Sequence, residues 1–548
     1  MLREEKTFPL SGGIILLVLS FLVIFSPLQL GERELYWQEG FHAAQATEMN
    51  LTLPITVAHG EAINNSFPLY PWLASIILQY TGLPMEFVLR AISVLALALI
   101  AAIVWRATRF AGGIQAAFAA TAMMISSNII IDKTPEGYPL TMIAIFMLSG
   151  WLLWFNLGFV RGNWNHAWLI SLLFGGLTFY TGGFQSLLYF IFPFLFMRRP
   201  LGIWTKLNRP GFWGGVAILS GFVMLWGIPY IVLSGQLPFT SFSPGNQLGR
   251  YFEHLLFFPL DVILRIAPWQ VLAWSPFCVA LFSLDSTPIY SRFLRTVVIS
   301  LFFGLWLNPF SEPRDMVILL PALSILCGLN YWIIARRYGD RIIKICSIPA
   351  GMLVIPATII LLFYFIPAEW GLQQLKLERG FAFRELLKNQ IAGVSGAVLL
   401  IIISGFLTVN GRQRPLWCWL LMLSMSCSIF SWSIIVPYRA QENEKRMLGH
   451  EIHEALKYES VPSGEIIYKA KILDLYNECH YMGWPVKKIS SLKELPAQQK
   501  TVYLISTEFP QDPSRRWRNL LPDRMEYRQQ RLCLYQGTLA NFEESKEL

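Results

Sequence analysis

The stretch WQEGFHAAQATEMNLTLPITVAHGEAINNSFPLYPW, residues 37 to 72, decides how the chain is interpreted, because it is a long polar segment directly after an apolar run. That run, Ile14 to Leu28, has a basic flank but no small-residue cleavage site, so we interpret it as a retained first membrane span. Long structured loops between packed elements usually carry function. We therefore expect the functional centre in the loop 31–86.

The composition predicts an all-α polytopic membrane protein. The chain has 548 residues, of which 54% are hydrophobic and only 14% charged. After the first span, about twelve further apolar runs are long enough to cross a bilayer, which makes about thirteen transmembrane helices. They lie near 87–105, 112–131, 140–160, 167–180, 184–197, 212–233, 269–284, 297–309, 316–334, 345–366, 391–409 and 416–436. The pair flanking residues 180–184 could instead be one broken helix.

The distribution of charge predicts the topology. The segments on the N-terminal side of the spans hold seventeen basic and four acidic residues, whereas the opposite loops hold about ten basic and about fifteen acidic. The positive-inside rule then places the N-terminus in the cytoplasm, and the loop 31–86 and the C-terminal tail outside. Because the formal charge of +9 resides mostly in short loops between spans, it does not indicate nucleic-acid binding.

After residue 437 the composition changes to mixed charge without any spanning run. We expect two domains, a transmembrane domain 1–437 and an outward-facing α/β domain 438–548. An amphipathic helix is predicted over 443–458 and short buried strands over 465–468 and 501–505. Of the seven cysteines, only Cys479 and Cys533 lie in this tail, where they could pair in an oxidising compartment.

Glu39 is the candidate catalytic residue. It lies among Tyr36, Trp37 and Phe41 just after a span, where partial desolvation would raise its basicity toward that of a general base. On position alone, an ordinary solvated or helix-capping glutamate is the favoured alternative. The histidines of HEIH, 450–453, lack the spacing of a zinc motif, and no phosphate-binding glycine motif or catalytic serine or cysteine signature is present.

A resemblance to a known family favours a catalytic role for Glu39 over that of an ordinary glutamate. Residues 38–49, QEGFHAAQATEM, resemble D-E-G-x-Y-x-x-x-A-R-x-M, the first-loop motif of GT-C fold glycosyltransferases that use polyprenyl-phosphate sugars. That family includes aminoarabinose transferases of lipid A and protein O-mannosyltransferases. Residues 66–73 are similar to its K-P-P-L-Y-Y-W-L segment and residues 89–93 to its R-L-x-S. Further matches in the same order occur at 181–184 (T-K-G), 268–270 (P-W-S) and 311–323 (S-x-x-P-R-Y-x-L-P-x-x-P-A-L).

The departures from this pattern each remove a charge. Gln38 stands where the family has aspartate, Thr47 where it has arginine, and Ser66 and Gly182 where it has lysines. The resemblance implies an acid at Glu39, for acceptor deprotonation or metal binding, with Gln38 and His42 beside it in substrate binding.

The resemblance also implies a second acid in the next outward loop, IDKTPEGYP, residues 131–139. Glu136 is the position that we match to it, with Asp132 as the alternative. A turn rich in proline and glycine at the membrane edge is an equal alternative for both residues. Two such carboxylates could hold a divalent metal ion through oxygen ligands, and no other cofactor is expected.

The leaving lipid phosphate needs cationic partners that Ser66 and Gly182 cannot supply. The outward loops offer Lys133, Arg250 and Arg314, and Arg250 also resembles an arginine of the family's fourth outward loop. Snorkelling at the interface is an equal alternative for a lone arginine at a membrane edge.

The resemblance thus implies an inverting glycosyltransferase of the bacterial inner membrane. It would be surrounded by membrane lipids and would move a sugar from a polyprenyl-phosphate donor to a lipid, glycan or protein acceptor on the outer face of the membrane. One alternative is a transporter or flippase of lipid-linked precursors, which would require charges within the spans, and almost none are present. The other is a non-catalytic relative that binds lipid-linked sugar or serves as a scaffold, which the four lost charges favour.

Overall fold

The computed structural model describes residues 9–25, 30–31, 33–49, 55–63, 66–198, 200–235, 248–279, 282, 285, 287–365, 391–409, 415–431, 443–521, 526–527 and 530–539. The chain forms two compact units. Unit 1 comprises residues 1–33, 90–224 and 241–441, and unit 2 comprises 34–89, 225–240 and 442–548. The first loop and the tail therefore belong to the same unit, whereas the division at residue 437 stays a prediction.

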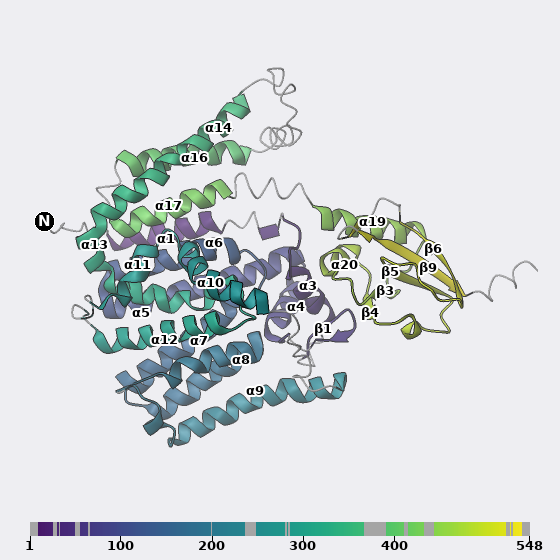
Figure 1. The fold of residues 1–548 in the computed structure, drawn as a ribbon, viewed down its shortest axis with the longest axis horizontal. Coiled ribbons are helices and arrows are strands. Elements are labelled where there is room, and N and C mark those ends of the chain that lie inside the picture. The colour runs from purple at the N-terminus through teal and green to yellow at the C-terminus, as the bar shows by residue number, and fades with distance from the viewer. Residues whose placement is uncertain are drawn as a thin grey trace, which may run out of the picture. The chain divides into compact units, whose positions relative to one another are not determined.

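Unit 1 is helical (Figure 1). Its elements are α1 (Leu10–Ile24), α5 (Met85–Ser126), α6 (Asn128–Lys133), α7 (Leu140–Trp154), the π-helix η1 (Phe155–Val160), α8 (Trp164–Leu195), η2 (Trp204–Lys206), α9 (Pro210–Ser234), α10 (Leu248–Arg265), α11 (Gln270–Trp274), η3 (Ser275–Phe277), α12 (Pro288–Leu307), η5 (Pro313–Ile318), α13 (Leu320–Met352), α14 (Val354–Phe365), α16 (Ile391–Val409) and α17 (Leu416–Phe430). The first residues of α5 and the last of α9 belong to unit 2. Helices α14, α16 and α17 lie side by side.

Two of these helices are hairpins. In α8 the rings of Trp168 and Phe194 lie 5.6 Å apart, although 26 residues of straight helix would separate them by about 39 Å. The chain reverses at Gly183, whose φ is 72°. In α5 the rings of Trp105 and Phe118 are 4.8 Å apart across a reversal at Gly113. The two spans predicted around residues 180–184 are therefore the arms of one hairpin.

Among the described residues, six helices are long and apolar enough to cross a membrane, or seven if one bent pair counts as a single span. The expected thirteen spans stay a prediction. The span expected over 269–284 was wrong as a single helix. The described residues of that range form the short elements α11 and η3, and the bend between residues 251–265 and 270–277 is 119°. Pro268 lies between these two segments, where a proline cannot continue the helical hydrogen bonding.

Unit 2 combines the first loop with a mixed sheet. Its elements are α3 (Glu39–Glu48), β1 (Val57–Ala58), β2 (Glu61–Ala62), α4 (Leu69–Thr81), α19 (Glu444–Tyr458), β3 (Ile467–Ala470), α20 (Tyr476–Met482), β4 (Val486–Ile489), η8 (Leu492–Glu494), β5 (Thr501–Ser506), β6 (Arg515–Asn519), β7 (Glu526–Tyr527), β8 (Gln530–Arg531) and β9 (Cys533–Leu539). The helix and the second strand predicted in the tail are confirmed, and the first strand forms two residues later than predicted, over Ile467–Ala470.

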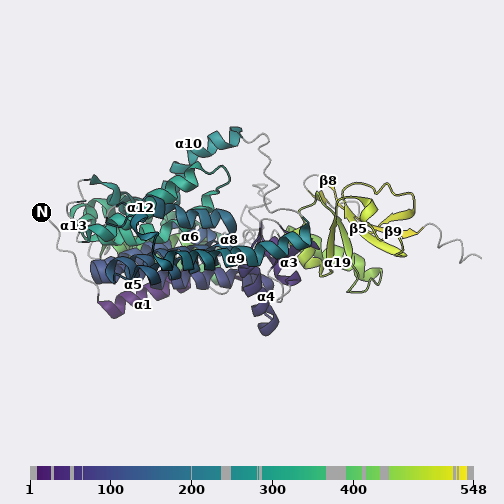
Figure 2. The same ribbon diagram turned by 90° about the horizontal axis from the view of Figure 1, so that it is seen from below.

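The main sheet has the order β4-β3-β5-β9-β6. Strand β3 is parallel to β4 and β5, whereas β9 is antiparallel to β5 and β6, with Leu504 opposite Tyr535. Strands β5 and β9 lie side by side (Figure 2). Ile452 and Leu456 of α19 pack into the core together with Met482 and the sheet residues Ile467 and Ile505. Cys479 and Cys533 are buried free thiols, so the pairing considered from the sequence is not formed.

The reversal at Gly113 gives a prediction about stability. Gly113 has φ 83° and ψ −175°, a region essentially restricted to glycine, while a Cβ there would meet no atom within 4 Å. Gly113→Ala should cost about 1–3 kcal/mol through backbone strain alone. In the matched control Gly221→Ala, also with open space but inside α9, alanine should be neutral or better by about 0.5–1 kcal/mol. Thermal unfolding of the detergent-purified proteins measures both; equal stability of the two variants would contradict the strained reversal.

Candidate functional site

Glu39 begins helix α3 and is only 3% exposed. One of its carboxylate oxygens accepts a hydrogen bond of 2.7 Å from the backbone N–H of Tyr36. The donor of this bond precedes the helix, whereas the position of Glu39 in the first turn lets the positive end of the helix dipole stabilise its carboxylate. Burial excludes the solvated alternative, whereas the raised basicity of Glu39 stays a prediction.

The other first-loop residues of the motif pack around the same helix. Gln38 immediately precedes α3, and the His42 side chain is 7% exposed. Nδ1 of His42 lies 3.2 Å from Oε1 of Gln45, and the imidazole meets the Tyr70 ring edge-on at 5.4 Å. Tyr70 belongs to the segment 66–73, so two separately matched pieces of the family pattern come together within unit 2.

The first loop is joined to the tail by hydrogen bonds. Glu34 accepts from the backbone N–H groups of Lys445 and Arg446, at 3.1 and 3.0 Å, at the start of α19. Glu86 accepts from the Tyr481 hydroxyl at 3.0 Å and pairs with Arg446 at 3.2 Å. Sequence reasoning missed this connection, because residues so distant along the chain show no periodicity that would link them.

A polar cluster lies where the β1–β2 turn meets α20 within unit 2. The His59 imidazole stacks on the Tyr476 ring at 4.7 Å, and Nζ of Lys469 lies 4.4 Å from the centre of that ring. Burial, together with the smaller effects of the Lys469 and Lys488 charges, lowers the pKa of His59 to about 3. Both carboxylate oxygens of Glu48 accept from backbone N–H groups, of His59 and Gly60, while burial still raises the Glu48 pKa.

In unit 1 the structure places three predicted residues in two neighbouring loops. Nζ of Lys133 lies 2.8 Å from a carboxylate oxygen of Glu136 and 3.4 Å from one of Asp132. Arg314 pairs with Glu312 at 2.6 Å and lies over the Tyr138 ring at 4.3 Å. Both proposed phosphate partners therefore already hold acidic partners. Arg250 lies in the first turn of α10, and its side chain is outside the described residues.

Sequence reasoning missed Asp315 and His254. Asp315 caps η5 by accepting from the Glu312 backbone N–H, and burial raises its pKa to about 6. His254 lies one turn after Arg250 on α10, with Nε2 3.2 Å from Oγ of Ser311. Asp315 stands where the family's S-x-x-P-R-Y pattern has tyrosine, so that departure was the available signal; His254 belongs to no quoted motif.

Glu39 and Glu136 belong to different units, so the two-acid hypothesis stays a prediction. Within the described ranges, no group of three or more histidine, cysteine, aspartate or glutamate side chains is arranged to hold a metal ion. A metal ion bound by the two carboxylates likewise stays a prediction.

The arrangement defines an integral membrane protein with two units. One unit is helical, and the other combines the first loop with the α/β tail. ArnT from Cupriavidus metallidurans in the apo state aligns with a TM-score of 0.69 at 14% identity, covering 96% of this chain and 98% of that one. ArnT bound to undecaprenyl phosphate aligns over the same shares with a TM-score of 0.66 at 15% identity. The chain thus has the fold of ArnT, and the predicted GT-C fold is confirmed.

An oligosaccharyltransferase from Archaeoglobus fulgidus in the apo form aligns at 11% identity with a TM-score of 0.45, over 90% of this chain and 69% of that one. No protein-family model matches the sequence, and no curated protein does.

Gly40 allows helices α3 and α20 to approach each other. A Cβ at this position would lie 2.2 Å from Oδ1 of Asn477 and 2.6 Å from its backbone nitrogen. Gly40→Ala should therefore destabilise the protein by about 1–3 kcal/mol, because a backbone must shift. Gly464→Ala is the control, with no atom within 4 Å. Thermal unfolding and proteolysis of the tail should separate the two variants; an unaffected Gly40→Ala would show that the helices do not pack this closely.

Lys469 is completely buried, and its Nζ has no hydrogen-bond partner among the described residues. Burial lowers its pKa, so the unfolded chain binds the proton more tightly and stability should rise with pH toward the ordinary range of lysine. Lys469→Met should stabilise the protein by about 1 kcal/mol or more near pH 7, with a smaller gain at higher pH. The control is Lys471→Met, whose ammonium is mostly exposed and lies 3.5 Å from Glu61. Melting temperatures from pH 7 to 9 measure both; a less stable Lys469→Met would contradict this reasoning.

Proposed function

We propose that this protein is a membrane glycosyltransferase that moves a sugar from a polyprenyl-phosphate donor to a lipid, glycan or protein acceptor on the outer face of the membrane. The observation that carries the proposal is the alignment with ArnT bound to undecaprenyl phosphate, which extends over nearly the whole of both chains. The ordered family motifs in the sequence and the buried carboxylate of Glu39 support it independently.

In the proposed reaction Glu39 accepts the proton of the acceptor hydroxyl, whose oxygen attacks the anomeric carbon of the donor sugar. The bond between that carbon and the phosphate oxygen breaks, and the polyprenyl phosphate leaves with the electron pair. A carboxylate held at a helix start with little solvent around it has fixed orientation, which favours proton transfer along one direction. The configuration at the anomeric carbon inverts in this single displacement.

To bind Lys133 or Arg314, the leaving phosphate would have to displace the carboxylates that now pair with them. Lys133 is bound to Glu136 and Asp132, and Arg314 to Glu312. A phosphate carries enough charge to compete for either cation through charge-assisted hydrogen bonds. We propose Lys133, Arg250 and Arg314 as donor-binding residues on this basis, with Gln38 and His42 as substrate contacts and Glu136 as the second acid.

The neutralised cations also favour a second candidate function, a non-catalytic protein that binds lipid-linked sugar. Each of the four departures from the family pattern removes a charge, and the two cations described in the loops of unit 1 are already paired. Such a protein would bind polyprenyl phosphate without transferring its sugar.

Glu39→Gln should lower sugar transfer by about 10²- to 10⁴-fold, because the amide cannot accept the proton, while donor binding is retained. Membranes containing the full-length protein and a radiolabelled polyprenyl-phosphate sugar provide the assay. Glu48→Gln is the control, since Glu48 ends the same helix but binds backbone N–H groups.

Transfer by Glu39→Gln at the wild-type rate would contradict the base assignment. Binding of the donor by the wild type without any transfer would instead favour the non-catalytic protein.

A further inference from the structure

Unit 1 contains a cavity of about 660 Å³ that the proposed transfer reaction does not use. It is lined by α5 from Arg106 to Ala111, by the π-helix η1 with Arg161, and by residues 287–290 at the start of α12. Its volume is that of typical ligand sites. All of its arginines belong to the segments that charge distribution predicts to be cytoplasmic, opposite the side expected for transfer.

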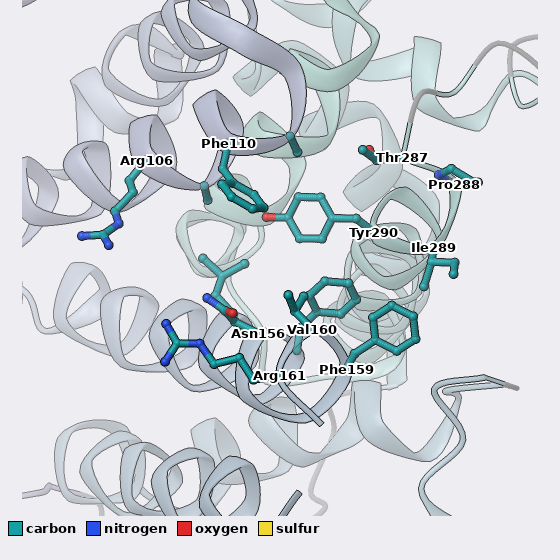
Figure 3. A pocket seen from close by; sticks show the side chains of 14 residues that line it. Arg106, Phe110, Asn156, Phe159, Val160, Arg161, Thr287, Pro288, Ile289 and Tyr290 are labelled. Atoms are coloured by element: carbon teal, nitrogen blue, oxygen red, sulfur yellow. The ribbon is translucent and has the colours of Figure 1, made fainter. Parts of the chain in front are cut away.

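The cavity has a cationic end. Figure 3 shows the guanidinium groups of Arg106 and Arg161 and the amide of Asn156 on one side of it. Neither guanidinium group makes an ion pair or a hydrogen bond in the part of the chain that the structure describes. Two unneutralised guanidinium groups beside an amide donor suit a phosphate, because guanidinium donors match phosphate oxygens in geometry and charge.

The remaining wall is apolar and aromatic. The Phe155 ring packs on Tyr290 at 5.1 Å and on Phe159 at 5.4 Å, and Phe110, also lining the cavity, is 88% exposed. A phenylalanine this exposed at a membrane edge is positioned to contact a hydrocarbon chain. A free phosphate would make no use of this wall.

The backbone at the cavity is also unusual. Residues 155–160 form a π-helix, closed by the Arg161 N–H bond of 3.0 Å to the Asn156 carbonyl. A π-helical turn is rare and frequently marks a functional site. Here it directly precedes Arg161 and carries Asn156, Phe155 and Phe159, so it sets the position of both the polar and the aromatic groups.

We propose that this cavity binds an anionic glycerophospholipid of the cytoplasmic leaflet. Arg106, Arg161 and Asn156 would hold the headgroup phosphate, and Phe110, Phe159 and Ile289 would contact an acyl chain. Anionic lipids are concentrated in that leaflet, which agrees with the predicted side of the cavity. The inference is independent of the sugar-transfer proposal.

The test is native mass spectrometry of the full-length protein after titration with phosphatidylglycerol or phosphatidylcholine. The double variant Arg106→Gln/Arg161→Gln should bind phosphatidylglycerol at least about tenfold more weakly than the wild type does. Arg109→Gln/Arg292→Gln is the matched control: it removes two exposed arginines on the same predicted side that do not line the cavity, and should bind as the wild type does. Ala107→Trp fills the cavity without changing charge and should also weaken binding.

An equal loss in the control pair would overturn the proposal in favour of diffuse surface attraction. Full binding by Ala107→Trp would overturn it as well, provided that its melting temperature matches the wild type; if it does not, the arginine pair alone decides. Displacement of the lipid by millimolar inorganic phosphate would assign the site to free phosphate rather than to a lipid. Equal affinity for phosphatidylcholine and phosphatidylglycerol would overturn the proposal that the cavity selects an anionic headgroup.

Discussion

The close packing of the first loop on the tail is the constraint on which the rest of unit 2 depends. Glu34 places a carboxylate at the amino end of α19, where backbone N–H groups lack partners within the helix. A few residues later Gly40 brings α3 against Asn477 of α20. These contacts join segments more than 400 residues apart in the sequence. The proposed catalytic carboxylate is thereby held on a folded support rather than on an independent loop.

That support affects the chemistry as much as the stability. A carboxylate that is 3% exposed and hydrogen-bonded to the Tyr36 N–H has few orientations, so its use as a base depends on the geometry of α3. In unit 1 the cations Lys133 and Arg314 are instead neutralised by Glu136 and Glu312. The charges of these two cations are thus balanced within the chain, and a phosphate ligand would have to displace existing ion pairs.

The sequence predicted the fold class, because apolar runs of spanning length and the composition change after residue 437 are properties of single segments. The tail helix and two of its strands also followed from local periodicity. The failed span at 269–284 has a different origin: the range is apolar, but it contains Pro276, where α11 ends and the short η3 begins. Hydropathy alone could not reveal that α5 turns back on itself at Gly113 and α8 at Gly183.

The candidate site was less accessible to sequence reasoning. The aromatic neighbours of Glu39 suggested partial desolvation, although position alone favoured a solvated or helix-capping glutamate, and the side chain is buried. The pairing of Lys133 and Arg314 with nearby acids requires loop conformations that sequence spacing does not fix. The polar contacts of His59, Lys469 and Tyr476 join the first loop to the tail, so no local sequence pattern predicts them.

Amide hydrogen exchange of the full-length protein in nanodiscs tests the central claim most directly. If the first loop and the tail fold as one unit, the amides of residues 39–48 should be protected to a degree comparable with those of strand β5, residues 501–506. Exchange of residues 39–48 at the rate of an exposed loop, while β5 remains protected, would contradict the account.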